Sequence, residues 1–398
     1  MLNSHEKRSA WGAVFAMSLA AFALISSEFM PVSLLTPIAA DLHISEGRAG
    51  QAISVSGAFA VLTSLLISPV AGKLDRKLLL LLLTLLMIVS GTVVAFAPNY
   101  VVFMIGRALI GVAIGGFWSM SAATTMRLVA DRHVPRALAI LNSGNALASV
   151  LAAPMGSFLG AIIGWRWTFF CVVPVAAIAF GWKAVGLPSM KAGQAPGSGN
   201  AFRLLARPAV SLGMTACALF FMGQFALFTY LRPFLETVAH VSATTLSLVL
   251  FIIGVAGFVG TTLIGAFLKD GLYRTLAVIP ALMAVIAVAL VSFGGAVSVS
   301  AVLLGIWGLV ATAALIGWWT WLARTLPKDA EAGGGLMVAI IQLAIMFGAS
   351  IGGILFDASG YQATFGASAA VLVVAAILAL LTARVTTNPV QGVCWSKS

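Results

Sequence analysis

The chain has 398 residues, of which 61% are hydrophobic and only 8% are charged. Soluble domains carry about a quarter charged residues. Too few polar side chains are therefore available to cover a soluble core, and we expect an integral membrane protein. The formal net charge of +11 would by itself allow nucleic-acid binding, but the placement of the basic residues argues against it.

Twelve apolar runs follow one another along the chain. Each has about 20 residues or more and lacks the strict alternation of a membrane β-barrel strand, so each is predicted to cross the bilayer as a helix. The runs lie at residues 11–39, 49–71, 78–97, 100–126, 137–163, 167–187, 208–231, 243–267, 272–293, 299–323, 334–356 and 361–383. The first run is longer than the apolar part of a signal peptide, and we expect it to be a retained helix.

Basic residues lie mainly in alternate loops. With the N-terminus placed inside, 18 of the 22 Lys and Arg residues fall on the inner side. These residues are Lys7, Arg8, Lys73, Arg76, Lys77, Arg127, Arg132, Arg136, Lys183, Lys191, Arg203, Arg207, Lys269, Arg274, Arg324, Lys328, Arg384 and Lys397. Only Arg48, Arg166 and Arg232 fall in outer loops. The bias follows the positive-inside rule and predicts cytoplasmic termini. Contact with anionic lipid headgroups then accounts for the net charge, so we expect a lipid bilayer and no nucleic acid as partner.

A stretch rich in Pro, Gly and Ser at 188–207 separates the first six runs from the last six. We expect it to be a cytoplasmic linker between an N-terminal bundle at 1–187 and a C-terminal bundle at 208–398. Matching segments occur in the same order in both parts: "LLTPIAADLHIS" at 34–45 and "YLRPFLETVAHVS" at 230–242, "GFWSM" at 116–120 and "GWWTW" at 317–321, and "GWRWTF" at 164–169 and "GYQATF" at 360–365. The sequence therefore predicts an all-α membrane fold of two pseudo-symmetric six-helix bundles, as in transporters with two rocking halves.

Three short segments carry a family resemblance. "SPVAGKLDRK" at 68–77 resembles the loop between helices 2 and 3 of the major facilitator superfamily. "GRALIGVAIGG" at 106–116 and "LAAPMGSFLG" at 151–160 resemble the helix 4 and helix 5 signatures of its twelve-helix drug:proton antiporters. The resemblance implies a gating loop made of Gly72, Lys73, Asp75, Arg76 and Lys77. Gly72 stands where an aspartate is usual, so the family's gating ion pair is either absent or supplied by Asp75.

Longer stretches, among them "EFMPVSLLTPIAADLHISEGRAGQ", "GGFWSMSAATTMRL" and "GQFALFTYLRP", resemble the bacterial purine ribonucleoside exporters of this branch. The resemblance implies a monomeric secondary transporter of the bacterial inner membrane. It would export purine ribonucleosides in exchange for protons by rocker-switch alternating access. The alternatives are drug or sugar efflux by the same mechanism, or proton-coupled import, because symport and antiport use the same parts.

Two charged residues lie deep inside the apolar runs, Glu28 and Arg107. An embedded carboxylate is costly in its charged form, so such a residue tends to face a cavity and suits the binding and release of a proton. Counted along their helices, Glu28 lies about 25 Å from the inner end and Arg107 about 10 Å from the outer end, which are similar depths in a core of about 30 Å. We predict that they form the proton-coupling site. Alternatively, Glu28 serves helix packing and Arg107 only ties backbone carbonyls.

Polar and aromatic residues inside the predicted cavity helices are candidates for substrate binding, because amides can hydrogen-bond a base or ribose and aromatic rings can stack on a purine. They are Trp118, Ser119, Asn142, Asn145, Gln224, Tyr230, Trp318, Trp319 and Gln342. The alternative for the Trp residues is lipid contact, and for the amides it is an interhelical hydrogen bond.

Other function classes lack their motifs. The sequence has no GxxxxGK[ST] phosphate loop for an ATP-driven pump and no HExxH motif, and the four His lie in tails or loops. One buried carboxylate is too few for paired acid–base catalysis. We expect neither an enzyme nor a cofactor or metal site, and the three cysteines do not suggest a disulfide framework.

Overall fold

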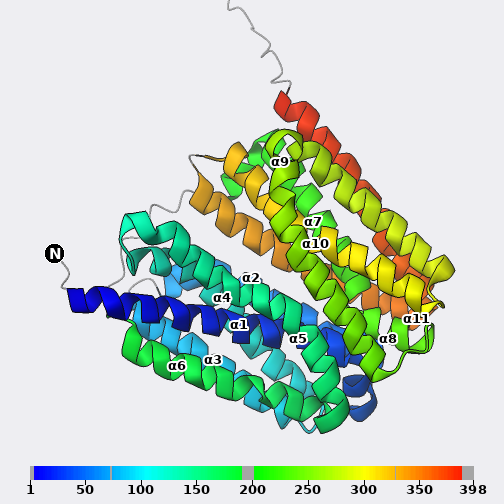
Figure 1. Ribbon diagram of the computed structural model, residues 1–398, viewed down its shortest axis with the longest axis horizontal. Coiled ribbons are helices and arrows are strands. Elements are labelled where there is room, and N and C mark those ends of the chain that lie inside the picture. Colours follow the sequence, from blue (N-terminus) through cyan, green and yellow to red (C-terminus); the bar gives the residue numbers. More distant parts are fainter. Residues whose placement is uncertain (1–3, 72–73, 191–200, 328, 388–398) are drawn as a thin grey trace, which may run out of the picture.

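The computed structural model describes residues 4–71, 74–190, 201–327 and 329–387, and these residues form helices and no β-strand (Figure 1). In the first half, residues 4–190, the helices are α1 (Ser4–Asp41), α2 (Glu46–Ala71), α3 (Arg76–Ala95), α4 (Tyr100–Arg127), α5 (Val134–Phe170) and α6 (Val172–Gly186). In the second half, residues 201–387, they are α7 (Pro208–Phe228), α8 (Leu231–Thr237), α9 (Ala243–Phe293), α10 (Val297–Thr325) and α11 (Ala330–Thr387). Short 3₁₀ turns, η1 (Asp131–His133) and η2 (Ala201–Ala206), precede α5 and α7.

The helices account for the twelve predicted spans. Ten helical stretches of the described chain are long and apolar enough to cross a membrane. Two of them, Val134–Gly186 and Gly333–Thr386, have 53 and 54 residues, which is about twice the length a bilayer requires. Each is broken by a glycine, Gly164 or Gly360, and therefore contains two spans.

The two glycines occupy the same rare backbone conformation. Gly164 has φ 79° and ψ 160°, and Gly360 has φ 76° and ψ −173°, a region that is essentially restricted to glycine. They stand at equivalent places in the predicted repeat. His43 and His240, in the matched segments 34–45 and 230–242, also share a positive φ, of 53° and 49°. The structure thus confirms the duplicated architecture down to its unusual turns.

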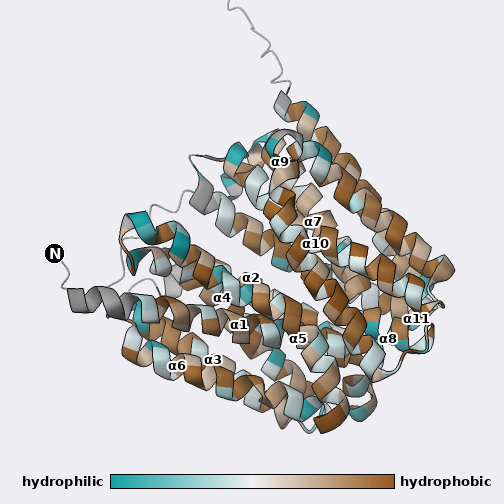
Figure 2. Ribbon diagram, viewed as in Figure 1, coloured by the Kyte–Doolittle hydropathy of each residue, from teal (hydrophilic) through white to brown (hydrophobic). Residues whose placement is uncertain are grey.

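The buried hydrophobic residues form two clusters. One runs from Ala13 to Met190 and the other from Leu204 to Ala379, with only a few residues assigned across the boundary. Hydrophobic residues predominate along most helices (Figure 2). Val185 is 89% exposed, and contact with lipid would cover it. We propose that the units 1–187 and 208–398 correspond to these clusters. Residues 191–200 of the predicted linker lie outside the described residues.

Candidate functional site

Glu28 lies in the middle of α1 and connects the two halves. It is 3% exposed, and its Oε1 accepts a hydrogen bond of 3.2 Å from Nε2 of Gln342 in α11. Its Oε2 and Oε1 of Gln342 have no hydrogen-bond partner among the described residues. The predicted proton-coupling carboxylate therefore keeps one oxygen free for a proton or a ligand, while the other joins the halves.

Arg107 is fully buried in α4 and makes four hydrogen bonds. Three go to backbone carbonyls: Nε donates to Ala52 O at 3.2 Å, Nη1 to Ser27 O at 2.7 Å, and Nη2 to Glu28 O at 3.1 Å. Nη2 also donates to the Ser56 hydroxyl at 3.2 Å. The guanidinium thus lies beside Glu28 but bonds its main chain, and the carboxylate takes its hydrogen bond from Gln342 instead.

Two arginines compensate for the two prolines of α1. A proline cannot donate to the carbonyl four residues earlier, so Pro31 frees Ser27 O and Pro37 frees Ser33 O. Arg107 of the first half donates to Ser27 O, and Nη1 of Arg232 in α8 of the second half donates to Ser33 O. One freed carbonyl is therefore satisfied within its own half and the other across the interface, where Arg232 also pairs with Glu236.

Gln224 is the counterpart of Glu28 in the second half. The matched segments that begin at 34 and 230 place Glu28–Phe29 opposite Gln224–Phe225, and the rings of Phe29 and Phe225 stack with centroids 5.7 Å apart. Oε1 of Gln224 is buried and has no partner among the described residues. The repeat thus brings a carboxylic acid and its amide analogue to equivalent positions beside stacked aromatic rings.

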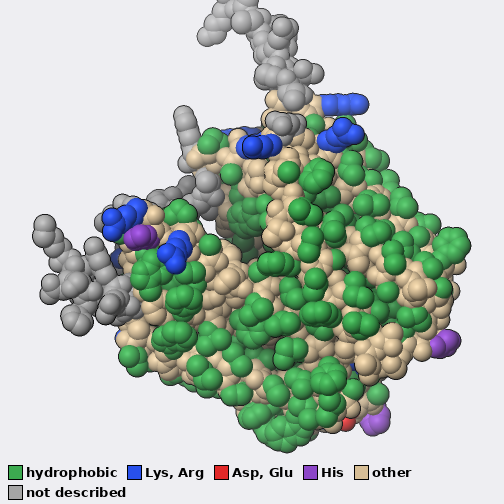
Figure 3. Space-filling view, viewed as in Figure 1, with side chains coloured by type: hydrophobic (Ala, Val, Ile, Leu, Met, Phe, Trp, Pro, Cys, Tyr) green, Lys and Arg blue, Asp and Glu red, His purple; other side chains and the backbone are tan. Residues whose placement is uncertain are grey.

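Direct contacts between the halves cluster where α1 ends and α2 begins, which we call the closed end. Asp357 of α11 accepts from the Ser45 hydroxyl at 2.6 Å and from the Gly47 amide at 2.9 Å. The hydroxyl of Ser350 donates to that of Ser54 at 2.9 Å. Away from this end the two lobes diverge around a recess, and Lys and Arg side chains lie near the diverging ends in the same view (Figure 3).

The family model of the Major Facilitator Superfamily matches residues 17–334. The chain belongs to this superfamily.

Relatives and a solved structure agree with this assignment over nearly the whole chain. "Transcription regulatory protein OpdE" of Pseudomonas aeruginosa is 61% identical over 383 residues, 95% of each chain. "Purine ribonucleoside efflux pump NepI" of Salmonella typhimurium is 41% identical over 379 residues, 95% of this chain and 96% of the relative. A solved bacterial homologue of the human lysosomal transporter Spinster shares the fold, with a TM-score of 0.75 at 16% identity over 98% of this chain and 99% of the other. The predicted family and fold are confirmed, and the protein is a multi-pass membrane transporter.

Four predicted substrate residues of this transporter lie in α4 and α5. Trp118 is partly buried with its ring against Phe117, and the exposed Ser119 donates to Gly115 O of its own helix. Asn142 is exposed and donates to Leu138 O, and Asn145 is half-buried. Within the described part of the chain, no hydrogen bond or ring contact joins these side chains to Glu28 or Gln342, so their part in substrate binding stays a prediction.

Three aromatic candidates of the transporter have different surroundings. Tyr230 is fully buried at the closed end, where its hydroxyl donates to Ala349 O at 2.7 Å. Trp318 is 1% exposed and packs against Trp321 inside the second half, whereas Trp319 is 39% exposed. Tyr230 and Trp318 thus have packing roles in this conformation, and binding by any of the three stays a prediction.

The described part of the predicted gating loop is held by Asp75. Its carboxylate accepts from the Lys77 amide at 2.7 Å, which caps α3, and from the Ser189 hydroxyl beyond α6. The amide of Arg76 donates to Met190 O at 3.0 Å. Gly72 and Lys73 lie outside the described residues. Asp75 thus ties the loop to the end of its own half.

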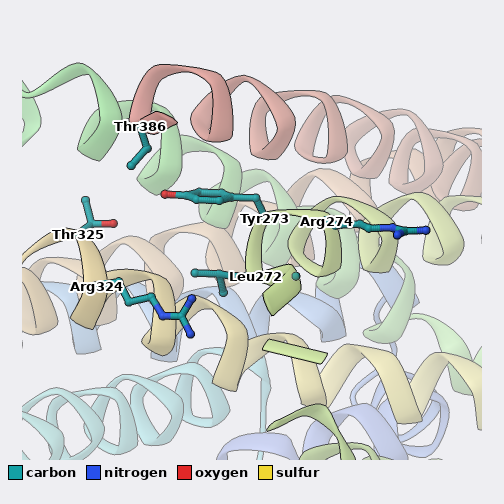
Figure 4. Close-up of a pocket in the computed structure, with 7 residues that line it drawn as sticks. Leu272, Tyr273, Arg274, Arg324, Thr325 and Thr386 are labelled. Atoms are coloured by element: carbon teal, nitrogen blue, oxygen red, sulfur yellow. The ribbon is translucent and has the colours of Figure 1, made fainter. Parts of the chain in front are cut away.

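A cavity of about 390 Å³ lies away from Glu28, where α9, α10 and α11 come together (Figure 4). It is lined by Gly271, Leu272, Tyr273, Arg274, Arg324, Thr325 and Thr386. Arg324 donates there to Leu268 O at 3.0 Å, while the Arg274 side chain points away from the other labelled residues. None of the predicted site residues lines this cavity.

The structure corrects one expectation and adds three residues. Lys183, which we counted among the basic residues of the inner side and not among the embedded charges, is fully buried, because α6 continues to Gly186 and the side chain turns inward. Arg107 is therefore not the only embedded cation. Arg232 was expected in an outer loop, and only the fold shows that it and Asp357 reach across the halves. The position of Lys183 inside the apolar run 167–187 was the one available signal.

Proposed function

We propose that this transporter exports purine ribonucleosides, or polar molecules of similar chemistry, in exchange for protons. The observation that carries the proposal is the Glu28–Gln342 hydrogen bond between the halves. It supports a mechanism in which the charge of one carboxyl group alters the contact between two rocking bodies. The identity to the relative named as a purine ribonucleoside efflux pump supports the choice of substrate.

The chain's own residues suggest how the exchange would work. Deprotonated Glu28 accepts from Gln342 and favours the conformation described here. Protonation of the free Oε2 turns that oxygen into a donor and removes the negative charge, which weakens the contact with Gln342. Substrate would bind beside this pair, with Gln224 supplying hydrogen bonds and the Phe29 and Phe225 rings supplying apolar contact. The closed end would face outward, both termini would lie in the cytoplasm, and a monomer would suffice without a cofactor.

Drug or sugar efflux is the second candidate for the same machinery, and proton-coupled import is the third. The relative named as a transcription regulatory protein does not favour nucleic-acid binding by this chain. The described part of the chain consists largely of helices that are apolar enough to cross a membrane. Lys and Arg side chains lie near the ends where the two lobes diverge.

The test uses inverted membrane vesicles with an acidic interior and measures uptake of radiolabelled guanosine or adenosine. We expect wild type to accumulate nucleoside. Glu28→Gln should still insert into the membrane, but its pH-driven uptake rate should be at least about ten-fold lower. Asp329→Asn, the same chemical change at an exposed ion pair, is the control and should transport normally. Normal pH-driven uptake by Glu28→Gln would refute the coupling role.

Substrate and direction are tested in the same vesicles. Alanine at Gln224 or Gln342 should lower nucleoside uptake more than it lowers protein level, whereas equal losses indicate a packing role. Uptake of drugs or sugars in place of nucleosides would overturn the substrate proposal. Nucleoside accumulation only in right-side-out vesicles with an acidic exterior would establish import.

A further inference from the structure

Lys183 is a buried cationic residue that the proposed mechanism does not use. It lies in α6 and is 0% exposed. Its Nζ donates to the Thr84 hydroxyl of α3 at 2.8 Å and lies 5.1 Å from the centre of the Phe117 ring of α4. The Thr84 hydroxyl in turn donates to Leu80 O at 2.7 Å. The amine therefore has one hydroxyl acceptor and one aromatic face.

A small cavity beside Nζ contains no counter-charge. It has a volume of about 10 Å³ and is lined by Ala20, Leu24, Leu83, Thr84, Met87, Ala113, Phe117 and Lys183. Lys183 is the only titratable residue among them. A volume of this size approaches the space of one water molecule, which would lie beside the amine and could exchange a proton with it.

The nearest charged residues on the surrounding helices lie at least one turn away along each helix. On α1, Glu28 comes one turn after Leu24, and on α4, Arg107 comes nearly two turns before Ala113. On α3, Arg76 and Lys77 lie at the first turn, and α6 has no other charged residue. No carboxylate pairs with Lys183 within the described chain.

These surroundings do not suit a permanent ammonium ion. Three N–H donors would face one hydroxyl acceptor in an apolar site, and an unpaired charge at membrane depth is costly. Phe117 and a single water give partial stabilisation, which suits a group that is charged for only part of a cycle. A buried lysine loses its proton more readily than a buried arginine.

We propose that Lys183 is a second proton-binding site of the transporter, inside the first half and apart from the Glu28–Gln342 pair. The Nζ lone pair takes a proton from hydronium, whose O–H bond breaks to leave water as the N–H bond forms, and the N–H bond breaks again when the proton returns to water, so no other reactant is required. The use of this proton in transport rests on the proposed proton antiport, but its binding does not.

The test is a difference titration of purified protein in detergent, which requires no transport. Protons taken up between about pH 9 and pH 5 are counted for wild type and Lys183→Met. A lysine in water stays protonated over this range. We expect wild type to bind one more proton than Lys183→Met, and equal counts would overturn the proposal. Lys183→Gln provides a second neutral variant where Lys183→Met does not fold.

A matched variant separates proton binding from packing. Thr84→Ser removes a methyl group beside Nζ but keeps the hydroxyl acceptor and the amine, so it should retain the extra proton, and its loss would show that the difference reflects packing. In proteoliposomes, Lys183→Met should exchange one proton fewer per nucleoside. An unchanged proton count in titration refutes the Lys183 site alone, whereas absence of proton exchange by wild type refutes the antiport proposal alone.

Discussion

Asp75 shows how a single residue can join two distant parts of the chain. It is the N-cap of α3, and its carboxylate also accepts from Ser189, which follows α6. The Ser189 hydroxyl, together with backbone donors that include the Lys77 amide, holds the pKa of Asp75 below its usual range. A carboxylate whose pKa is lowered by folding contributes stability above the pKa of the unfolded chain. That contribution is lost as the pH falls through the folded-state pKa.

We therefore expect Asp75→Ala to lower the free energy of unfolding by about 1 kcal/mol at neutral pH. The difference from wild type should shrink below about pH 4, where the carboxyl group becomes protonated in the unfolded chain and then in the folded chain. Thermal unfolding in detergent at several pH values measures this. Asp75→Ser keeps a capping oxygen without a charge and should retain most of the stability. Equal melting temperatures of wild type and Asp75→Ala at pH 7 would contradict the prediction.

Residue chemistry also explains which parts of the site were predictable. Glu28 and Arg107 could be identified because a charge inside an apolar run is rare and costly. Their hydrogen-bond partners could not be identified from the sequence. Arg107 bonds backbone carbonyls of α1 and α2, and every residue has a carbonyl, so the sequence does not show which ones lack a partner within their helix. Gln342 was one of several candidate amides, and only the fold, which places its amide 3.2 Å from the Glu28 carboxylate, selects it.

At the scale of elements, the chain reversal at Gly164 depends on backbone freedom alone. A Cβ added to Gly164 would meet no atom within 4 Å, yet its φ of 79° and ψ of 160° strain any other residue.

Gly164→Ala should therefore destabilise the protein by about 1–3 kcal/mol, measured by thermal unfolding in detergent. Gly181→Ala is the matched control, because its added Cβ also meets nothing. Gly181 is helical, so alanine there should be neutral or stabilising by about 0.5–1 kcal/mol. Equal effects of the two variants would show that the backbone conformation is not the cause.

The prolines of α1 act through the carbonyls that they free, and the two carbonyls have partners of different kinds. Pro37→Ala restores an N–H that can donate to Ser33 O and so competes with Arg232 of the other half. We expect Pro37→Ala to loosen the closed end and to speed thiol labelling of a Ser350→Cys reporter, with the native cysteines replaced. Pro31→Ala affects a carbonyl held by Arg107 of the same half and should leave labelling unchanged. Slower or unchanged labelling in Pro37→Ala would contradict this role.

At the scale of the molecule, the repeat could be predicted from short matching segments, because each marks a turn that both halves must make. The relation between the halves could not, because side chains from different repeats decide it. Asp357, Arg232 and Gln342 have no side chain of the same type at the equivalent positions of the first half, Ala161, Thr36 and Ala146, and each bonds the opposite half. The architecture is thus symmetric while the contacts that hold one conformation are not.

This asymmetry makes Asp357 the sharpest test of alternating access. It bonds the hydroxyl of Ser45 and the amide of Gly47 at the start of α2, so Asp357→Ala removes a charge-assisted contact that exists only while the closed end is closed. Spin labels at the exposed Pro98, in the loop before α4, and at the exposed Ser298, in the first turn of α10, should report a longer mean distance in Asp357→Ala.

Asp41→Ala is the matched control for Asp357→Ala. It breaks an ion pair with Arg166 at the same end but within one half, so it should leave the distance between the labels unchanged. If both variants lengthened the distance equally, general loosening would explain the change. If neither did, the closed end would be held by the remaining contacts, and the population of the two conformations would not depend on Asp357. A longer distance in Asp357→Ala alone would show that the Asp357 contact stabilises one conformation, whereas the Asp41–Arg166 ion pair stabilises only the fold of its own half.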